Sequence, residues 1–428
     1  MSPSAREVAL ELVRRVADEG AYSNRLLPAI LSRSRLDQRD RAFATELAYG
    51  TLRHVPELDA ALAASSSRPV ARMTPGARAA LRLGVYQLLH TRIPPHAAVG
   101  ETVGTLPPRE RGFVNAILRR ISERAPTPPI GDDDVALSIR SGMAPWGIAE
   151  LRRLLPPDEV EPAALAFGER GPLTLRVNSC RTAVDDVIDA LCAAGLEPAV
   201  GAVHPECLVL SGGDPTTIPG WRDGWFAVQD QASAFVVETL DPHPGDRVLD
   251  ACAAPGGKTA FLACRVGAEG AVVAADRHAD RAALIPTALD RLGLHASVLA
   301  QDATHLALSA SFDRILVDAP CSGIGAARRR PELLWRPRRD ALSRLARLQV
   351  AIVTRTADLL RPGGRLVYSV CTFPRAETDA AADAIVRHRP DLVPLETEGP
   401  DGPGTRHRLW PHRHGTDGMF VAAFEKRT

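Results

Sequence analysis

The sequence lacks the long apolar runs that would place it in or across a membrane. No stretch approaches the roughly 18 uncharged apolar residues that a membrane span needs, and the amino terminus mixes charged residues among its apolar ones, unlike a signal peptide. Hydrophobic residues make up 45% of the chain and charged residues 24%, which is typical of globular proteins. We therefore expect a soluble protein of the cytosol, without a membrane partner.

The sequence also lacks paired cysteines. Its seven cysteines are scattered and include no C-x-x-C pair, so neither a disulfide framework nor a structural zinc site is expected, and we predict no metal. Four of them are expected to be small buried hydrophobic residues: Cys180, Cys192, Cys207 and Cys264. The net charge of +1 neither favours nor excludes a nucleic-acid partner, because a binding face needs only a local excess of Lys and Arg.

The length of 428 residues predicts two or three domains. Residues 1–130 read as successive helices with recognisable starts. Ser4 is a candidate N-cap for the first helix, Asp37 or Asp40 begins the next but one, which runs towards Gly50, and Thr74 followed by proline begins another. This pattern predicts a compact all-helical domain.

The pattern changes after a stretch rich in Pro, Gly and Asp at 124–134, which predicts a linker. Residues 131–235 contain the strand-like run LTLRVN, the helical run VDDVIDALCAAG and the apolar segment CLVL, which together predict a small α/β module. Residues 236–428 alternate short apolar strands with helices. That alternation predicts a parallel sheet with crossover helices.

A glycine-containing turn follows the first strand of this third region. Gly256 and Gly257, in the run CAAPGGKT, would let the backbone approach a ligand, although a tight turn alone also explains them. The G-x-G-x-x-G and G-x-x-x-x-G-K-[ST] patterns are absent, which disfavours NAD and ATP. The next two strands end at Asp276 and Asp302. Either acid could cap a helix, but together at one sheet edge they predict a site for an adenosine with a carboxylate tail.

Two further strands, FDRILVDAP and RLVYSVCT, bring Asp318, Cys321 and Cys371 to the same edge. Two thiols from neighbouring strands beside a nucleotide site predict chemistry rather than packing. A disulfide between them is the rival interpretation, but a cytosolic protein keeps its thiols reduced. Cys252, inside the glycine turn, is expected to shape that turn.

Several runs resemble one family, the RNA 5-methylcytosine methyltransferases of the Sun/RsmB group, and the resemblance extends over essentially the whole chain. The runs that carry it are CAAPGGKT (252–259), DAPCSGIG (318–325), RRRPELLW (328–335), YSVCT (368–372) and DGMFVAAFEK (417–426). RDRAFATELAYGTLRH and FVNAILRR are similar to a NusB-like domain. The resemblance implies a NusB-like RNA-binding domain at 1–130, a small α/β linker module at 131–235, and a Rossmann-like S-adenosylmethionine-dependent methyltransferase domain with a mostly parallel seven-stranded sheet at 236–428.

The resemblance also implies roles for individual residues. Cys371 would attack carbon 6 of cytosine, Asp318 would share a proton at ring nitrogen 3, Cys321 would assist breakdown of the adduct, and Lys258 would orient the groups. The residues implied to bind S-adenosylmethionine are Cys252, Ala253, Ala254, Pro255, Gly256, Gly257, Lys258, Asp276, Asp302 and Asp318. On chemistry alone the two cysteines could exchange roles.

The chain departs from the family around the predicted nucleophile. Val370 and Thr372 flank Cys371 where the family commonly has Thr and Ser, and Glu377 is followed by Thr and Asp where the family has Glu-Asn-Glu. These changes leave open any hydrogen bond from a hydroxyl beside Cys371.

An arginine-rich strip follows Cys321 and predicts phosphate contacts, with Trp335 available for base stacking; a solvated helix face is the alternative. Its members are Arg328, Arg329, Arg330, Arg336, Arg338, Arg339, Arg344 and Arg347, against Glu332 and Asp340. We expect a monomer that acts on a looped-out cytosine of 16S ribosomal RNA. A transfer-RNA methyltransferase and a non-catalytic ribosome assembly factor remain alternatives.

Overall fold

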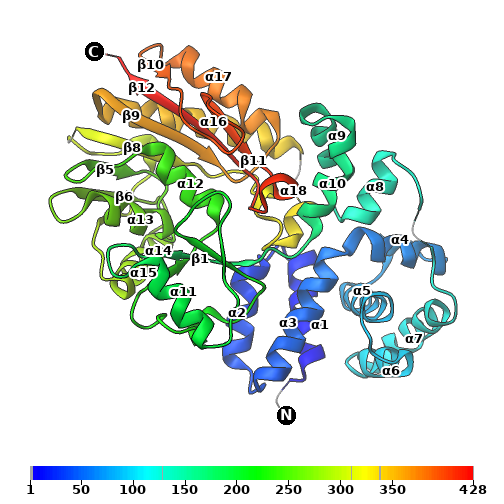
Figure 1. Cartoon of the computed structure of the whole chain (residues 1–428). Helices are drawn as coiled ribbons and strands as arrows, with labels where there is room; N and C mark the ends of the chain where they lie inside the picture. The colour runs from blue at the N-terminus through cyan, green and yellow to red at the C-terminus, as the bar shows by residue number, and fades with distance from the viewer. Residues whose placement is uncertain (1–2, 128, 310, 337–338, 428) are drawn as a thin grey trace. The chain divides into compact units, whose positions relative to one another are not determined.

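The computed structural model describes residues 3–127, 129–309, 311–336 and 339–427, shown in Figure 1. The chain divides into two compact units. The first comprises Met1–Arg170 together with Ala327–Pro337, and the second comprises Gly171–Ala326 with Arg338–Thr428. No helix in the described part of the chain has the length and apolar character needed to cross a membrane.

The first unit is all-helical, as predicted for residues 1–130, and its helices continue to Gly168, within the range that was predicted to be an α/β module. Its elements are α1 (Ala5–Asp18), α2 (Ser23–Arg33), α3 (Gln38–Arg53), α4 (Val55–Ser65), η1 (Val70–Arg72), α5 (Pro75–His90), α6 (Pro95–Gly104), α7 (Pro108–Glu123), α8 (Asp134–Ser141), α9 (Pro145–Leu154), α10 (Pro157–Gly168) and η5 (Pro331–Leu334). Ser4, Asp37 and Thr74 each accept a backbone N–H at the N-cap of α1, α3 and α5. Ser4 and Glu7 form a reciprocal capping box.

The third helix does not end at Gly50, where the sequence suggested its end. α3 continues to Arg53, and Gly50 lies buried in its interior. A Cβ atom on Gly50 would lie 2.0 Å from Cζ of Tyr86, so glycine here allows close approach of α5 instead of ending the helix.

The second unit begins with a small antiparallel sheet of strand order β2-β3-β1-β4. Its elements are β1 (Leu173–Val177), α11 (Val184–Ala193), β2 (Ala199–Val200), β3 (Cys207–Leu210), η2 (Pro215–Thr217) and β4 (Phe226–Val228). Asn178, which follows β1, donates from Nδ2 to the carbonyl oxygens of Gly224 and Leu292, both at 2.9 Å. The end of β1 is thereby tied to the end of helix α15 (Leu284–Leu292).

The rest of the second unit is built on the large sheet, with strand order β10-β12-β9-β8-β5-β6-β7. Its elements are α12 (Gln231–Leu240), β5 (Arg247–Asp250), α13 (Gly257–Val266), β6 (Ala271–Ala275), α14 (Ala279–Ala282), α15 (Leu284–Leu292), β7 (Ser297–Leu299), η3 (Ala303–His305), β8 (Phe312–Asp318), η4 (Ile324–Ala326), α16 (Arg339–Thr356), η6 (Ala357–Leu359), β9 (Leu360–Val370), η7 (Arg375–Glu377), α17 (Asp379–His388), β10 (Leu392–Pro394), β11 (Arg406–Leu409), α18 (Pro411–His414) and β12 (Met419–Lys426). Strands β5 to β9 are parallel, and β12 is antiparallel to β9 and β10.

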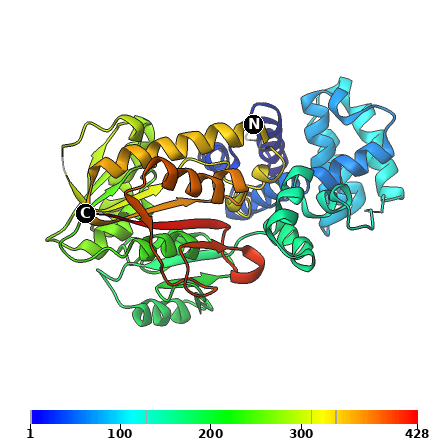
Figure 2. The same ribbon diagram turned by 90° about the horizontal axis from the view of Figure 1, so that it is seen from above.

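The predicted fold class is confirmed, with one addition to the sheet. β11 pairs with β12 and makes an eighth strand beside the seven. Alternate residues of the central strands face opposite sides of the sheet. Ile315 and Tyr368 lie in the core under α16 and α17, whereas Leu316 packs with α12 and α13 on the other face. Figure 2 shows these helix layers on the two sides of the strands.

Two predictions about structural cysteines are wrong. Cys180 and Cys264 form a disulfide between the segment after β1 and helix α13, with their Cα atoms 5.8 Å apart. They lie 84 residues apart in the sequence, so only the packing of the small sheet against α13 brings them together. Cys192, expected to be buried, is exposed on α11. Cys207 is buried in the core as expected.

Candidate active site

The carboxyl ends of the parallel strands bring the predicted site residues to one edge of the large sheet. Asp250 is the last residue of β5 and pairs with Ala274 of β6 and Leu316 of β8. Asp318, the last residue of β8, pairs with Ser369 of β9. These registers place the ends of four strands side by side, at the edge where open α/β sheets bind their ligands.

The glycine turn lies against this edge. Ala253 donates its N–H to the carbonyl oxygen of Ala275 at 2.9 Å, which fixes the turn between β5 and α13 against the end of β6. Gly256 has φ +105°, and a Cβ atom there would lie 3.3 Å from Cα of Ile285. A side chain is therefore disfavoured by both conformation and space. Helix α13 begins at Gly257, so its first N–H groups, which have no partner within the helix, face this turn.

The two acids that follow β6 and β7 make local hydrogen bonds. Asp276 accepts the N–H of His278 at 3.1 Å and lies 3.3 Å from a guanidinium nitrogen of Arg281. Asp302 accepts both the N–H and the hydroxyl of Thr304, at 2.9 and 2.7 Å, and these bonds hold its pKa below the ordinary value. Each acid thus makes the turn or cap that the sequence left open. A carboxylate has further acceptor sites, so this does not preclude ligand contact.

Asp318 and Lys258 form the central ion pair of the site. Nζ of Lys258 donates to Oδ2 of Asp318 at 2.7 Å and to Oγ of Ser233 at 3.4 Å, while Ser369 donates to Oδ1 of Asp318 at 2.9 Å. Burial lowers the pKa of Lys258, but the charge of Asp318 raises it further, so the pKa lies above its ordinary value. Lys258 is therefore charged at neutral pH, and both oxygens of Asp318 are held in place.

Asp250 was not singled out from the sequence, yet its carboxyl group is strongly perturbed. The residue is 1% exposed and accepts the hydroxyl of Thr259 at 2.7 Å. Burial raises the pKa of Asp250 to about 7, with the charge of Asp318 adding to the effect and the Thr259 hydrogen bond opposing it. Asp250 could have been identified from the sequence by its position at the end of a buried apolar strand.

The two predicted catalytic thiols lie side by side. Sγ of Cys321 and Sγ of Cys371 are 3.4 Å apart, and both cysteines are free, so the rival disulfide is not formed. The hydrogen bond to Cys371 and burial raise the pKa of Cys321 well above its ordinary value. Burial and the nearby carboxylates of Asp250 and Asp318 do the same for Cys252 in the glycine turn. Both groups are consequently thiols rather than thiolates in this state.

Main-chain and hydroxyl contacts join the segments that carry the two thiols. Oγ of Ser322 and Oγ1 of Thr372 share a hydrogen bond of 2.7 Å, and the N–H of Gly325 donates to the carbonyl of Cys371 at 3.0 Å. The sequence left open whether any hydroxyl beside Cys371 would form a hydrogen bond. Thr372, the residue after Cys371, forms such a bond with Ser322, in the segment that carries Cys321.

Comparison with known proteins supports one assignment for this arrangement. Residues 237–425 match the family described as 16S rRNA methyltransferase RsmB/F, residues 144–217 match the ferredoxin-like domain of RsmF/B-like methyltransferases, and residues 3–123 match the NusB family. A Mycobacterium tuberculosis protein named as a methyltransferase is 38% identical over 99% of this chain and 97% of its own. Ribosomal RNA small subunit methyltransferase B of Salmonella arizonae is 32% identical over 99% and 98%. The chain belongs to the RsmB/F family.

Members of the RsmB/F family are S-adenosylmethionine-dependent RNA methyltransferases. As a member of the family, this chain uses S-adenosylmethionine and acts on RNA. The solved structure of PH0851 covers 100% of both chains, with 26% identity and a TM-score of 0.84. The glycine turn fits the cofactor, because the start of α13 has no side-chain cap and its free N–H groups favour a carboxylate. Asp276, at 4% exposure, provides a buried acceptor beside it.

The arginine strip that was predicted to contact phosphate is divided between the helical unit, which uses or buries some of its members, and α16, where others are exposed, so phosphate contact stays a prediction for the exposed members. Arg336 donates to the carbonyl oxygens of Val16, Gly20 and Ala21 at the end of α1 within the helical unit. These carbonyls carry the negative end of the helix dipole, which attracts a guanidinium group. Arg328 is 8% exposed, while Arg339, Arg344 and Arg347 on α16 are exposed. Arg338 lies outside the described residues.

Trp335 is not available for base stacking, contrary to the prediction. Its Nε1 donates to the carbonyl of Leu52 at 2.9 Å, and its ring packs against the helical core. Glu332 is fully buried in the same unit and accepts the N–H and the hydroxyl of Ser23, at 3.0 and 2.8 Å. This segment follows Cys321 in sequence, but its side chains are used to build the helical unit.

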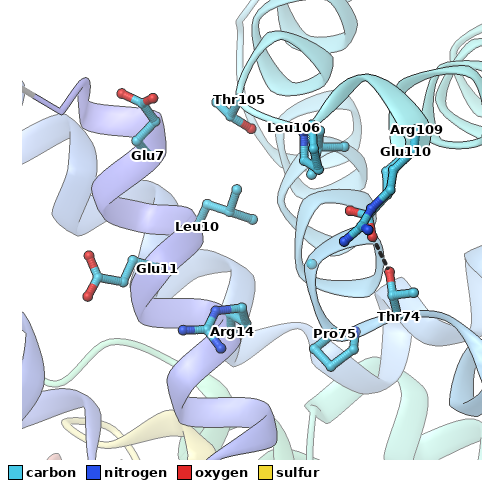
Figure 3. A pocket seen from close by; sticks show the side chains of 12 residues that line it. Glu7, Leu10, Glu11, Arg14, Thr74, Pro75, Thr105, Leu106, Arg109 and Glu110 are labelled. Carbon is cyan, nitrogen blue, oxygen red and sulfur yellow. Dashed lines mark hydrogen bonds between the residues drawn. The ribbon is translucent and has the colours of Figure 1, made fainter. Parts of the chain in front are cut away.

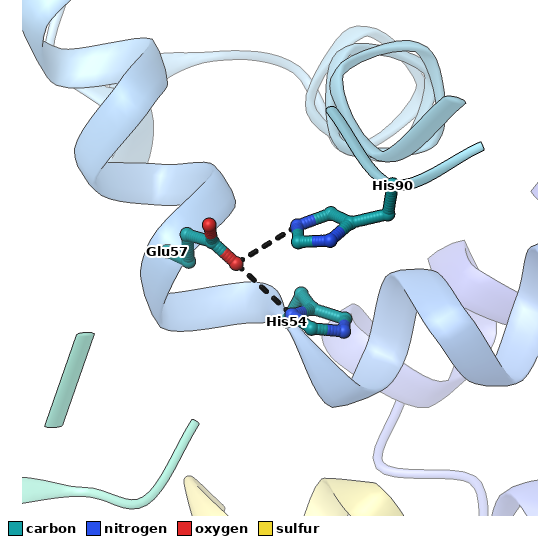
Figure 4. Close-up of side chains that lie close together, drawn as sticks. All are labelled: His54, Glu57 and His90. Atoms are coloured by element: carbon teal, nitrogen blue, oxygen red, sulfur yellow. Dashed lines mark hydrogen bonds and ion pairs between the residues drawn. The ribbon is translucent and has the colours of Figure 1, made fainter. Parts of the chain in front are cut away.

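Two further features of the helical unit do not belong to the sheet edge. Glu57 accepts hydrogen bonds from His54 and His90, both at 2.9 Å, and the two imidazoles stack with centroids 4.0 Å apart (Figure 4). An open pocket between α1 and the starts of α5 and α7 is lined by both acidic and basic side chains, including Glu110, which accepts the hydroxyl of Thr74 at 2.7 Å (Figure 3). The mixed charges of this pocket do not favour phosphate.

Proposed function

We propose that this chain transfers a methyl group to carbon 5 of a specific cytosine in 16S ribosomal RNA, through a covalent bond between a cysteine and carbon 6. The observation that carries this proposal is the pair of free thiols, 3.4 Å apart, at the sheet edge that also holds the Lys258–Asp318 ion pair. A methyltransferase acting on oxygen or on an exocyclic nitrogen needs no thiol, whereas carbon 5 of cytosine is not nucleophilic until a group adds at carbon 6.

The chemistry assigns different tasks to the two thiols. The thiolate of Cys371 adds to carbon 6, and ring nitrogen 3 takes a proton from the Asp318–Lys258 pair, so that carbon 5 becomes an enamine carbon. S-adenosylmethionine supplies the methyl group. Ring nitrogen 3 returns its proton to the Asp318–Lys258 pair, and a water molecule takes the proton from carbon 5. The electron pair of that C–H bond forms the double bond between carbons 5 and 6 as the bond from carbon 6 to sulfur breaks, and Cys371 departs as a thiolate, with Cys321 assisting this breakdown.

The polar contacts of the site support the assignment of Asp318 to the base. The hydrogen bond to Cys371, burial and the charges of Cys371, Glu377 and Asp318 raise the pKa of Cys321, which favours its neutral thiol. Asp318 holds one oxygen on Ser369 and the other on Lys258, which orients it as the group that receives the polar edge of the base. The target cytosine must leave its stack to reach such a site, which favours a looped or single-stranded region of RNA.

The test is methyl transfer from tritiated S-adenosylmethionine to unmethylated small-subunit RNA, transfer RNA and DNA, followed by nuclease digestion and nucleoside mapping. We expect label in 5-methylcytosine at one position of 16S ribosomal RNA. Label in transfer RNA alone would select the transfer-RNA alternative. RNA binding without any methyl transfer would sink the proposal and favour a non-catalytic assembly factor.

Three cysteine variants test the covalent step. Cys371→Ala is expected to abolish both turnover and the covalent RNA adduct, whereas Cys321→Ala is expected to accumulate the adduct on a denaturing gel. Cys192→Ala is the matched control, because that thiol is exposed on α11. An adduct that survives in Cys371→Ala and disappears in Cys321→Ala would reverse the two roles.

A further inference from the structure

We propose that Glu377 is a positioning residue that fixes the main chain on both sides of Cys321 and so governs release of the RNA adduct. This inference rests on the proposed function. Glu377 ends the short helix η7 after Cys371, and the sequence marked it only as part of a departure from the family pattern. Neither its burial nor its partners could be read from that pattern.

Glu377 contacts the segment that follows Cys321 directly. Its Oε1 accepts the N–H of Ser322 at 2.9 Å and Nε2 of Gln349, on α16, also at 2.9 Å. Glu377 and Gln349 are both fully buried. The carboxylate thus holds the peptide group that joins Cys321 to the next residue.

Gln349 extends this contact to the other side of the thiol. Its Nε2 also donates to the carbonyl oxygen of Pro320 at 3.0 Å, and its Oε1 accepts the hydroxyl of Tyr368 at 2.9 Å. The same hydroxyl is 2.6 Å from the carbonyl oxygen of Glu377, which closes the network. Residues immediately before and after Cys321 are therefore fixed by one buried hydrogen-bond network, which we call the Cys321 brace: Pro320, Ser322, Gln349, Tyr368 and Glu377.

A buried carboxylate in this place is costly, which argues that it does more than pack. Both donors to Oε1 are neutral groups, and Oε2 has no hydrogen-bond partner among the described residues. Burial raises the pKa of Glu377 even though the hydrogen bonds from Ser322 and Gln349 lower it. An apolar side chain would avoid this penalty but would leave the N–H of Ser322 unpaired.

The carboxylate also acts on the thiol through its charge. After the hydrogen bond to Cys371 and burial, the charge of Glu377 is among the causes that raise the pKa of Cys321. The charge of Glu377 thus adds to the causes that favour the neutral form of Cys321, whose sulfur lies 3.4 Å from that of Cys371. Glu377 therefore acts on Cys321 through both position and charge.

The experiment compares Glu377→Ala and Glu377→Gln with the unaltered protein, measuring single-turnover methyl transfer, the amount of covalent adduct and the pH dependence of adduct decay. A displaced thiol should slow release roughly 10- to 100-fold, so Glu377→Ala should accumulate adduct while methyl transfer changes little. Glu377→Gln keeps an acceptor for Ser322 but removes the charge. It should release the adduct with a pH profile shifted to lower pH.

The controls separate positioning from general damage. Asp379→Asn removes a nearby charge that pairs with Arg408, outside the Cys321 brace, and should leave decay unchanged. Cys321→Ala/Glu377→Ala should release adduct no more slowly than Cys321→Ala alone, because both changes act on one step. Additive losses in every step would mean a merely structural role and would overturn the inference.

Failure of this inference differs from failure of the proposed function. If the unaltered protein forms no 5-methylcytosine and Cys321→Ala gives no adduct, the proposed function fails. If those two behave as expected while Glu377→Ala releases adduct at the normal rate, only the present inference fails. Should Glu377→Ala not fold, Tyr368→Phe, which removes one hydroxyl of the brace, should give a smaller delay in the same direction, and normal release would contradict the role.

Discussion

The pKa values of acidic side chains are shifted in opposite directions at the sheet edge and in the helical unit. In the helical unit, burial raises the pKa of Glu57, but hydrogen bonds from His54 and His90 lower it to about 2. At the sheet edge, burial and the charge of Asp318 raise the pKa of Asp250 to about 7, while the hydrogen bond to Cys371 and burial raise that of Cys321 well above its ordinary value. Paired charge stabilises the first region, whereas crowded acidic groups cost stability in the second, as is typical of a site retained for chemistry.

The largest expected effect is at the Lys258–Asp318 pair. Asp318→Asn keeps the shape of the side chain but removes the charge that holds Lys258, 2.7 Å away, and so removes proton transfer to ring nitrogen 3. Methyl transfer should fall on the order of 10²- to 10⁴-fold, the usual contribution of a positioned acid or base, with little change in RNA affinity. Asp340→Asn, at an exposed acid, is the control. A loss below about threefold in single-turnover rate would remove Asp318 from the mechanism.

A second prediction concerns stability in the helical unit. Glu332→Ala leaves the N–H and hydroxyl of Ser23 buried without an acceptor, so the free energy of unfolding should fall by about 2–3 kcal/mol. Denaturant titration followed by circular dichroism measures this, with the exposed Glu123→Ala as control. An unchanged midpoint in Glu332→Ala would show that this buried acid is not structural and would weaken the contrast between the two regions.

The sequence was most informative where a local rule decides the structure. Ser4, Asp37 and Thr74 begin helices because their side chains accept free N–H groups, and strand ends meet at one edge because parallel sheets require it. The strand pattern alone therefore predicted that Cys321 and Cys371 lie at the ends of neighbouring strands. Their unequal roles came from the family resemblance and remain a proposal.

Contacts between distant segments were beyond the reach of the sequence. Arg336 and Trp335 are residue types that are common in RNA-binding surfaces. In the structure they instead donate to the carbonyl oxygens of Ala21 and Leu52, which lie more than 280 residues away in the chain. The disulfide of Cys180 with Cys264 and the contacts of Glu377 depend in the same way on tertiary packing. No periodicity or spacing encodes such pairs.

The pH dependence of stability should have opposite signs in the two regions. The pKa of Glu57 is about 2 in the folded protein and 4.5 ordinarily, so its contribution is present above pH 4.5 and is lost as pH falls towards 2. The pKa of Asp250 is raised from 3.8 to about 7, so its contribution is present below pH 4 and is lost as pH rises through 7. Glu57→Gln should destabilise the protein at pH 7, while Asp250→Asn should stabilise it increasingly from pH 5 to 8. Unfolding titrations across this range with equal slopes for both variants would contradict the comparison.

The smallest effect is expected on the exposed side of α16, where the divided arginine strip can be tested. Arg344 is exposed, so Arg344→Ala should leave stability unchanged and weaken RNA binding by about 1 kcal/mol or less, with the slope of log affinity against log salt falling by roughly 0.7 to 1. Arg336→Ala should lower the stability of the helical unit and leave the salt dependence of RNA binding unchanged. The reason is that the guanidinium of Arg336 donates to the carbonyl groups of Val16 and Ala21. Filter binding at several salt concentrations, beside denaturation of both variants, measures this. If both arginines change the salt slope alike, the strip is continuous in the RNA-bound protein, and the division that the free protein shows does not extend to its complex.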